Sequence, residues 1–170
     1  PCFAFAPSQL AWESMFGETP LPERYTLDNV QAEGIGLRLG VDSVALGGIL
    51  RKTTARKDWP AKKAQLSRSF LALSLPHGVK VWNRISPDDI DWKTVQSVYR
   101  KMSEFGYGNT DCDFLPYWEK RTELQASPEQ VIVSAYRRSG KILLVVANLK
   151  NTVTASLKLD FKKLGIPYDA

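Results

Sequence analysis

The chain has 170 residues, of which 44% are hydrophobic and 11% are aromatic. This composition excludes a disordered chain and allows a sizeable core, and the length predicts one domain or at most two small ones. No apolar run approaches the roughly 20 residues that a membrane-spanning helix needs, so we expect no membrane span.

The net charge of +5 comes from 23 basic and 18 acidic residues, and much of the excess lies in Arg51–Lys63. Clustered basic side chains suit the phosphates of nucleic acid. However, no recognition motif accompanies the cluster, and Trp59 is the only aromatic residue in it. We therefore favour a solvated loop and helix face, and we expect no nucleic-acid partner.

The first half of the chain predicts alternating helices and strands. Tyr25–Gly34 is a candidate short helix, and Val41–Leu50 is a candidate strand followed by a glycine-rich loop. A longer helix is expected from Asp58 to Ser74, because aspartate caps a helix start and proline is tolerated in the first turn. His77–Trp82 then predicts a short buried strand.

A further helix is predicted to begin at Ser86 and to end at Gly106, with Val95, Val98 and Met102 on its apolar face. Helices that alternate with strands are typical of the βα units of a parallel sheet or barrel. The next segment, Gly106–Leu124, is rich in aromatic residues and aspartate and has no period, so we expect a loop there.

Hairpin signals dominate the last part of the chain. Val131–Tyr136 and Ile142–Ala147 are apolar runs separated by a short polar linker that contains Gly140. These features predict an antiparallel hairpin. Val153–Leu159 alternates between apolar and polar residues, which predicts a third strand with one solvated face and a three-stranded meander. The change of pattern predicts a domain boundary near residues 126–128.

The aromatic loop carries the strongest candidate site. Asp111 and Asp113 lie beside Phe114, Tyr117 and Trp118. Aromatic faces can pack against the C–H faces of a sugar ring, while carboxylates accept hydrogen bonds from its hydroxyl groups. The alternative is that these rings fill an interface between two domains.

Other candidate residues are weaker. Trp82 ends a predicted barrel strand, where barrel enzymes place ligand contacts, although simple burial explains it equally well. His77 is the only histidine, and a lone histidine is more often structural than catalytic. Cys2 and Cys112 share no metal-ligand spacing with His77, and the sequence does not decide whether they form a disulfide. No phosphate-binding loop, nucleophile elbow or metal motif is present, so no cofactor and no metal are predicted.

Three segments together resemble the C-terminal part of large bacterial proteins related to the family 123 β-N-acetylgalactosaminidases. The segments are DWPAKKAQLSRSFLALSLPHGVKVW, FGYGNTDCDFLPYW and VIVSAYRRSGKILLVVANLKN. The resemblance implies an α/β part plus an all-β part. Residues 1–126 would be the last βα units of a (β/α)8 barrel, and residues 127–170 would begin an antiparallel β-sandwich.

The family uses an adjacent Asp-Glu pair, and this sequence contains no Asp-Glu dipeptide. We therefore expect a fragment of a carbohydrate-active protein that has its catalytic pair outside these residues and the remainder of a longer polypeptide as its partner. The resemblance places Trp82, Asp113, Tyr117 and Trp118 around a glycan ligand, and we expect an extracellular or periplasmic location. The alternatives are a non-catalytic glycan-binding module and a basic nucleic-acid-binding domain.

Overall fold

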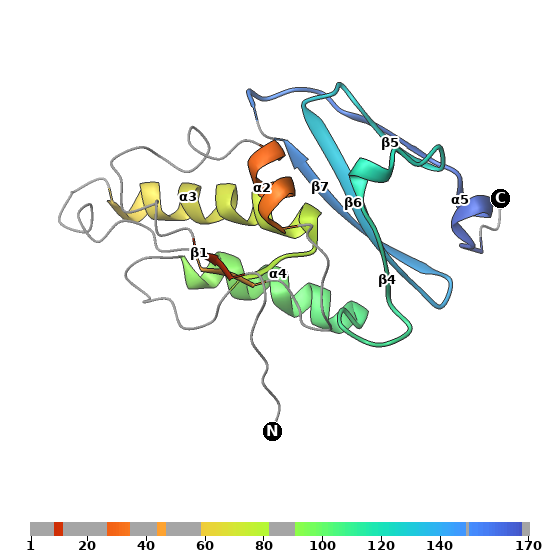
Figure 1. Cartoon of the computed structure of the whole chain (residues 1–170), viewed down its shortest axis with the longest axis horizontal. Coiled ribbons are helices and arrows are strands. Elements are labelled where there is room, and N and C mark those ends of the chain that lie inside the picture. The colour runs from red at the N-terminus through yellow and green to blue at the C-terminus, as the bar shows by residue number, and fades with distance from the viewer. Residues whose placement is uncertain are drawn as a thin grey trace. The chain divides into compact units, whose positions relative to one another are not determined.

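The computed structural model describes residues 9–11, 27–34, 44–46, 59–81, 91–148 and 150–167 (Figure 1). The chain divides into two compact units, Pro1–Ser97 and Val98–Ala170. Each unit has secondary structure of a different kind, and each is described by itself below.

The described residues of the first unit include three short parallel strands, β1 (Gln9–Ala11), β2 (Val44–Leu46) and β3 (Lys80–Val81). They lie in the order β1-β2-β3, so each strand pairs with the next one along the chain. Parallel neighbours need a crossover connection, usually a helix. Helix α2 (Leu27–Gly34) occurs between β1 and β2, and α3 (Trp59–Ser74) occurs between β2 and β3. The predicted α/β pattern is confirmed, whereas the barrel stays a prediction.

Helix α3 has the expected limits, and its Phe70 and Leu73 side chains are buried. A short 3-10 helix, η3 (Leu75–His77), follows it directly. Gly78 then takes a left-handed conformation at φ 67° and donates its N–H to the Leu75 carbonyl. This turn occupies the start of the predicted strand His77–Trp82, which was therefore placed too early. The described strand contains Lys80 and Val81 only.

Helix α4 (Trp92–Phe105) begins later than the predicted start at Ser86. Asp91 is the residue before its first turn: its carbonyl accepts from the Val95 N–H, and its carboxylate accepts from the Thr94 hydroxyl at 2.6 Å. The end at Gly106 is confirmed. Gly106 has φ +97° and donates to Ser103, while Tyr107 donates to Met102, which is the Schellman pattern of a helix C-terminus.

The second unit contains two antiparallel sheets. One sheet has the order β4-β6-β7 and consists of β4 (Asp113–Leu115), β6 (Val131–Arg138) and β7 (Lys141–Asn148). Figure 1 shows β6 and β7 as long strands that run side by side. The predicted hairpin is confirmed. Its turn is shorter than the predicted linker: only Ser139 and Gly140 lie between the paired ends, and both have positive φ, as a type I′ turn requires.

The predicted meander is wrong. Strand β8 (Ser156–Leu159) pairs with β5 (Leu124–Ser127) in a separate two-stranded sheet, and it does not continue from β7. The alternating pattern correctly indicates a strand with a solvated face, but it carries no information about the partner strand. The segment predicted as an aperiodic loop contains β4, the start of β5 and a 3-10 helix, η4 (Tyr117–Glu119).

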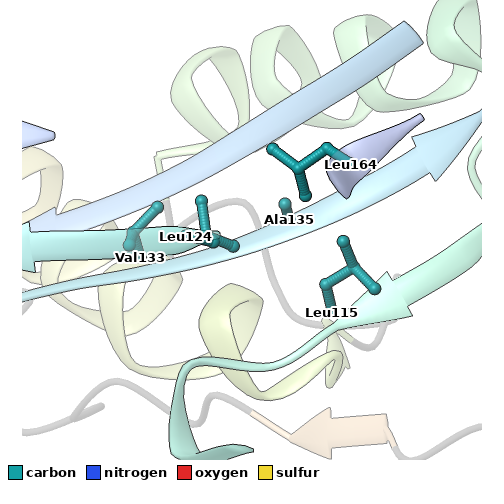
Figure 2. Packing of buried hydrophobic residues seen from close by; sticks show 5 residues of the cluster. All are labelled: Leu115, Leu124, Val133, Ala135 and Leu164. Atoms are coloured by element: carbon teal, nitrogen blue, oxygen red, sulfur yellow. The ribbon is translucent and has the colours of Figure 1, made fainter. Parts of the chain in front are cut away.

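A hydrophobic cluster holds the two sheets of the second unit together. Figure 2 shows its five buried side chains close to one another. They come from β4, β5, β6 and the short helix α5 (Phe161–Leu164), and they are Leu115, Leu124, Val133, Ala135 and Leu164. The side chain of Asp160 caps α5 by accepting from the Lys163 N–H at 3.0 Å, which directs Leu164 to the core, where it is 1% exposed.

Residues 126–128, where the sequence predicts a domain boundary, lie inside the second unit, in β5 and the turn that follows it. The unit boundary observed here falls between Ser97 and Val98. The assignment of residues 1–126 to a barrel and 127–170 to a sandwich stays a prediction. In the part of the chain that the structure describes, no helix has both the length and the apolar character needed to cross a membrane.

Candidate functional site

Three of the four predicted ligand residues lie close together in the sequence of the second unit. Asp113 begins β4, and Tyr117 and Trp118 form the first two residues of η4. The fourth, Trp82, lies outside the described residues. The N–H of Tyr117 donates to the Ser134 hydroxyl of β6 at 3.0 Å, so η4 is attached to the central strand of the larger sheet.

Aromatic rings form a continuous row from β6 to η4. Phe114 pairs with Tyr136 across the β4–β6 ladder, and their ring centroids lie 4.9 Å apart. Phe114 also contacts Trp118 edge-on at 5.9 Å, and Trp118 contacts Tyr117 at 5.2 Å and 85°. Edge-to-face contacts of this kind stabilise ring pairs beyond simple area burial. Tyr136 is buried, whereas Phe114, Tyr117 and Trp118 are half-buried, so the row runs from the core to the surface.

The two predicted aspartates are engaged by arginines of β6. Arg137 donates to Asp113 Oδ2 at 2.8 Å, and Arg138 donates to Asp111 Oδ2 at 2.7 Å. The hydrogen bond from Arg138 lowers the pKa of Asp111 below its ordinary value. Asp111 therefore does not resemble the raised-pKa acid that glycoside cleavage requires. Asp113 accepts a hydrogen bond from its arginine.

A groove of about 540 Å³ is lined in part by Tyr117 of η4. We call it the β5–β8 groove, because its walls come from η4, β5, β8, the first residues of β6 and the segments next to them. Its volume is in the range of small-molecule sites. Tyr117 is the member of the aromatic row that lines it, together with Lys120, Arg121 and Lys158. Trp118 and Asp113 are not among its lining residues.

Lys120 and Lys158 were not predicted as candidate site residues from the sequence. Lys158 belongs to β8 and reaches the groove because β8 pairs with β5, where its partner is the distant residue Gln125. Lys120 takes a left-handed conformation at φ 47° at the end of η4. One signal was available: Lys158 lies on the polar side of the alternating strand pattern.

The remaining candidates are structural or lie outside the described residues. His77 is fully buried, its Nδ1 lies 2.6 Å from the Leu73 carbonyl oxygen, and burial lowers its pKa. Cys112 is a half-buried free thiol, and burial raises its pKa, which makes it a poor nucleophile. Most of the basic stretch Arg51–Lys63 is not described. Among the described side chains, no group of histidine, cysteine and acidic residues has the arrangement of a metal site.

The second unit is thus a small antiparallel β-domain with two sheets, an aromatic row and a groove. Residues 94–170 match the family model of the glycoside hydrolase 123, C-terminal domain. The match begins close to the unit boundary at Ser97 and Val98. The C-terminal part of this chain is therefore glycoside hydrolase 123-like, as the resemblance implied. No curated protein and no solved structure matches the chain.

Proposed function

We propose that this chain is part of a glycoside hydrolase-like protein that acts on glycans containing amino sugars, outside the cytoplasm. In this proposal the chain contributes ligand contacts, and the catalytic acid pair lies in the remainder of a longer polypeptide. The observation that carries the proposal is the match of residues 94–170 to the glycoside hydrolase 123 C-terminal domain. The absence of an Asp-Glu dipeptide from all 170 residues supports the assignment of catalysis to other residues.

Tyr117 and Trp118 are the proposed glycan-contacting rings. Both are half-buried, so each ring is fixed by its neighbours and still has exposed surface. A fixed aromatic face binds the C–H face of a pyranose at a low entropic cost, because the protein side chain is already ordered. Tyr117 supports the proposal more strongly than Trp118, because it also lines the β5–β8 groove.

Asp113 is proposed as a hydrogen-bond acceptor. Its side chain is 61% exposed, and Arg137 engages Oδ2, which leaves Oδ1 for a sugar hydroxyl. The hydrogen bond from the arginine fixes the orientation of the carboxylate. Trp82 completes the proposed set on the strength of the resemblance.

A calorimetric titration with a neutral amino-sugar oligosaccharide tests the proposal. A suitable probe is a hexasaccharide of alternating N-acetylgalactosamine and glucuronate whose carboxyl groups have been reduced to alcohols. Tyr117→Ala should weaken binding about tenfold, which corresponds to about 1.4 kcal/mol. Tyr99→Ala is the matched control, because Tyr99 is also half-buried but does not line the groove. Equal affinities of wild type and Tyr117→Ala would contradict the proposal.

Activity provides a second test. The 170-residue chain should not hydrolyse an aryl N-acetylgalactosaminide, because the proposed acid pair lies elsewhere. Hydrolysis by this chain alone would contradict that part of the proposal. Binding without any hydrolysis by the complete parent polypeptide would instead favour the second candidate, a non-catalytic glycan-binding module.

A further inference from the structure

The β5–β8 groove has an apolar floor. Val131 and Val133 of β6 are 4% and 3% exposed, and Leu157 of β8, at 39% exposure, lines the same groove. Polar groups of β5 and β8, such as Gln125 and Ser156, stand beside these apolar side chains. A ligand that fits must therefore combine apolar surface with hydrogen-bonding groups, as a pyranose ring does.

Charge in the groove is unbalanced. Lys120 and Lys158 line it, both are exposed, and neither has an ion-pair partner among the described residues. Arg121 also lines the groove, but its charge is already paired. It forms one ion pair with Glu119 and a second with Glu123, in which the two atoms lie 3.3 Å apart. Glu129 contributes the one carboxylate among the lining residues. Two ammonium groups thus remain to pair with a negatively charged ligand.

We propose that the β5–β8 groove binds an anionic glycan, in which carboxylate or sulfate groups pair with Lys120 and Lys158 while a sugar ring lies against Tyr117. The inference rests on the proposed function and deepens it by naming the substrate class. Ammonium–anion hydrogen bonds are stronger than neutral ones, and a partly apolar groove reduces the screening of these pairs by water. Charge complementarity therefore selects an anionic ligand over a neutral one.

The test uses the 170-residue chain and three forms of one hexasaccharide of alternating N-acetylgalactosamine and glucuronate. The unsulfated form carries carboxylates only, the sulfated form carries both groups, and the carboxyl-reduced form is neutral. We expect at least one anionic form to bind about tenfold or more tightly than the neutral form, and its affinity to fall as salt screens the ion pairs. Comparison of the two anionic forms identifies which acidic group the groove recognises.

Substitution of the lysines locates the site. Lys120→Gln and Lys158→Gln should each weaken binding of the anionic form about threefold to tenfold and leave the neutral form unchanged. Lys162→Gln is the matched control, because Lys162 is an exposed lysine of α5 that does not line the groove. Lys162→Gln should leave the affinity for the neutral form unchanged. It should lower the affinity for the anionic form only by the small effect of one lost positive charge.

Glu129 supplies a test in the opposite direction. Because its carboxylate repels an anionic ligand, Glu129→Gln should tighten binding of the anionic form severalfold. Damage to the fold would weaken binding. A gain of affinity in Glu129→Gln therefore reports a change in ligand recognition and not a loss of stability. Unchanged or weaker binding by Glu129→Gln would contradict the proposed position of the anion.

The remaining outcomes distinguish this inference from the proposed function. Equal binding of the neutral and anionic forms, with loss in Tyr117→Ala, would overturn the anionic assignment and keep a glycan site. Failure of all three forms to bind would overturn both the anionic assignment and the proposed glycan site. Tighter binding of a DNA oligonucleotide than of any hexasaccharide would overturn the glycan class. A dimer that dissociates in Leu157→Glu and binds no glycan would assign the groove to a second copy of the chain.

Discussion

Arg138 and Asp111 connect the central strand of the second unit to the loop that follows α4. The guanidinium donates from Nε to Asp111 Oδ2 at 2.7 Å and, from its terminal nitrogen, to the Phe105 carbonyl at 3.3 Å. Because the last carbonyls of a helix lack partners within the helix, a cation at that end is favourable. A side chain at Gly106 would clash with the same guanidinium. Arg138 therefore fixes both the helix end and the loop that leads to β4.

Arg138→Ala tests this connection. The variant should lose about 1 kcal/mol of unfolding free energy in urea denaturation, because the Phe105 carbonyl loses a charge-assisted donor. Arg100→Ala is the control, since the ion pair between Arg100 and Glu104 is exposed and 4.0 Å long; it should change stability by a few tenths of a kcal/mol at most. Equal effects of the two substitutions would show that Arg138 does not stabilise the helix end.

Asp111 gives a prediction on pH dependence. Arg138 lowers the pKa of Asp111 in the folded chain. As the pH falls, Asp111 is therefore protonated at a higher pH in the unfolded chain than in the folded chain. The stabilisation is complete above the unfolded pKa of about 4 and is lost as pH falls through the lower folded pKa. Wild type should therefore be more stable than Asp111→Asn at pH 7, and the difference should shrink between pH 4 and pH 2. A difference that is constant over this range would contradict the ion pair.

The turn of the β6–β7 hairpin predicts opposite effects at adjacent positions. Ser139 and Gly140 have φ of 41° and 73°, and asparagine tolerates that region better than serine does. Ser139→Asn should stabilise the chain by a few tenths of a kcal/mol. Gly140→Ala should destabilise it by about 1–2 kcal/mol, because the left-handed conformation is unfavourable for alanine and its Cβ would lie 3.1 Å from Pro167. Thermal unfolding of both variants checks the signs.

Local sequence signals predicted the elements that depend on local chemistry. The β-branched runs Val131–Tyr136 and Ile142–Ala147 each contain enough strand-forming residues to specify β6 and β7, and Gly140 specifies their turn. The limits of helix α3 were predicted from an aspartate followed by an early proline in the sequence, and the end of α4 was predicted from Gly106. In each case the determinant lies within a few residues of the structure that it specifies.

The errors concern contacts between distant segments. Whether Leu157 and Leu159 face β7 or β5 depends on the core that Leu164 and Leu115 complete, and no alternating pattern contains that information. The three residues of β4 form a strand because β6 supplies their partners, although their own sequence indicates a loop. The β5–β8 groove, with Lys158 in its lining, was not predicted for the same reason.

The hydrophobic cluster leads to a last prediction, in which the same substitution is made at a buried and at an exposed leucine. Leu164 is 1% exposed at the centre of the cluster, whereas Leu157 is 39% exposed on the groove. Leu164→Ala should therefore cost about 2–5 kcal/mol, because it removes buried methyl groups and leaves a cavity between the sheets. Leu157→Ala should cost less than about 1 kcal/mol, since its side chain remains in contact with water. Urea denaturation of both variants measures the difference, and a cost at Leu157 equal to that at Leu164 would mean that the groove is part of a closed core and is not open to a ligand.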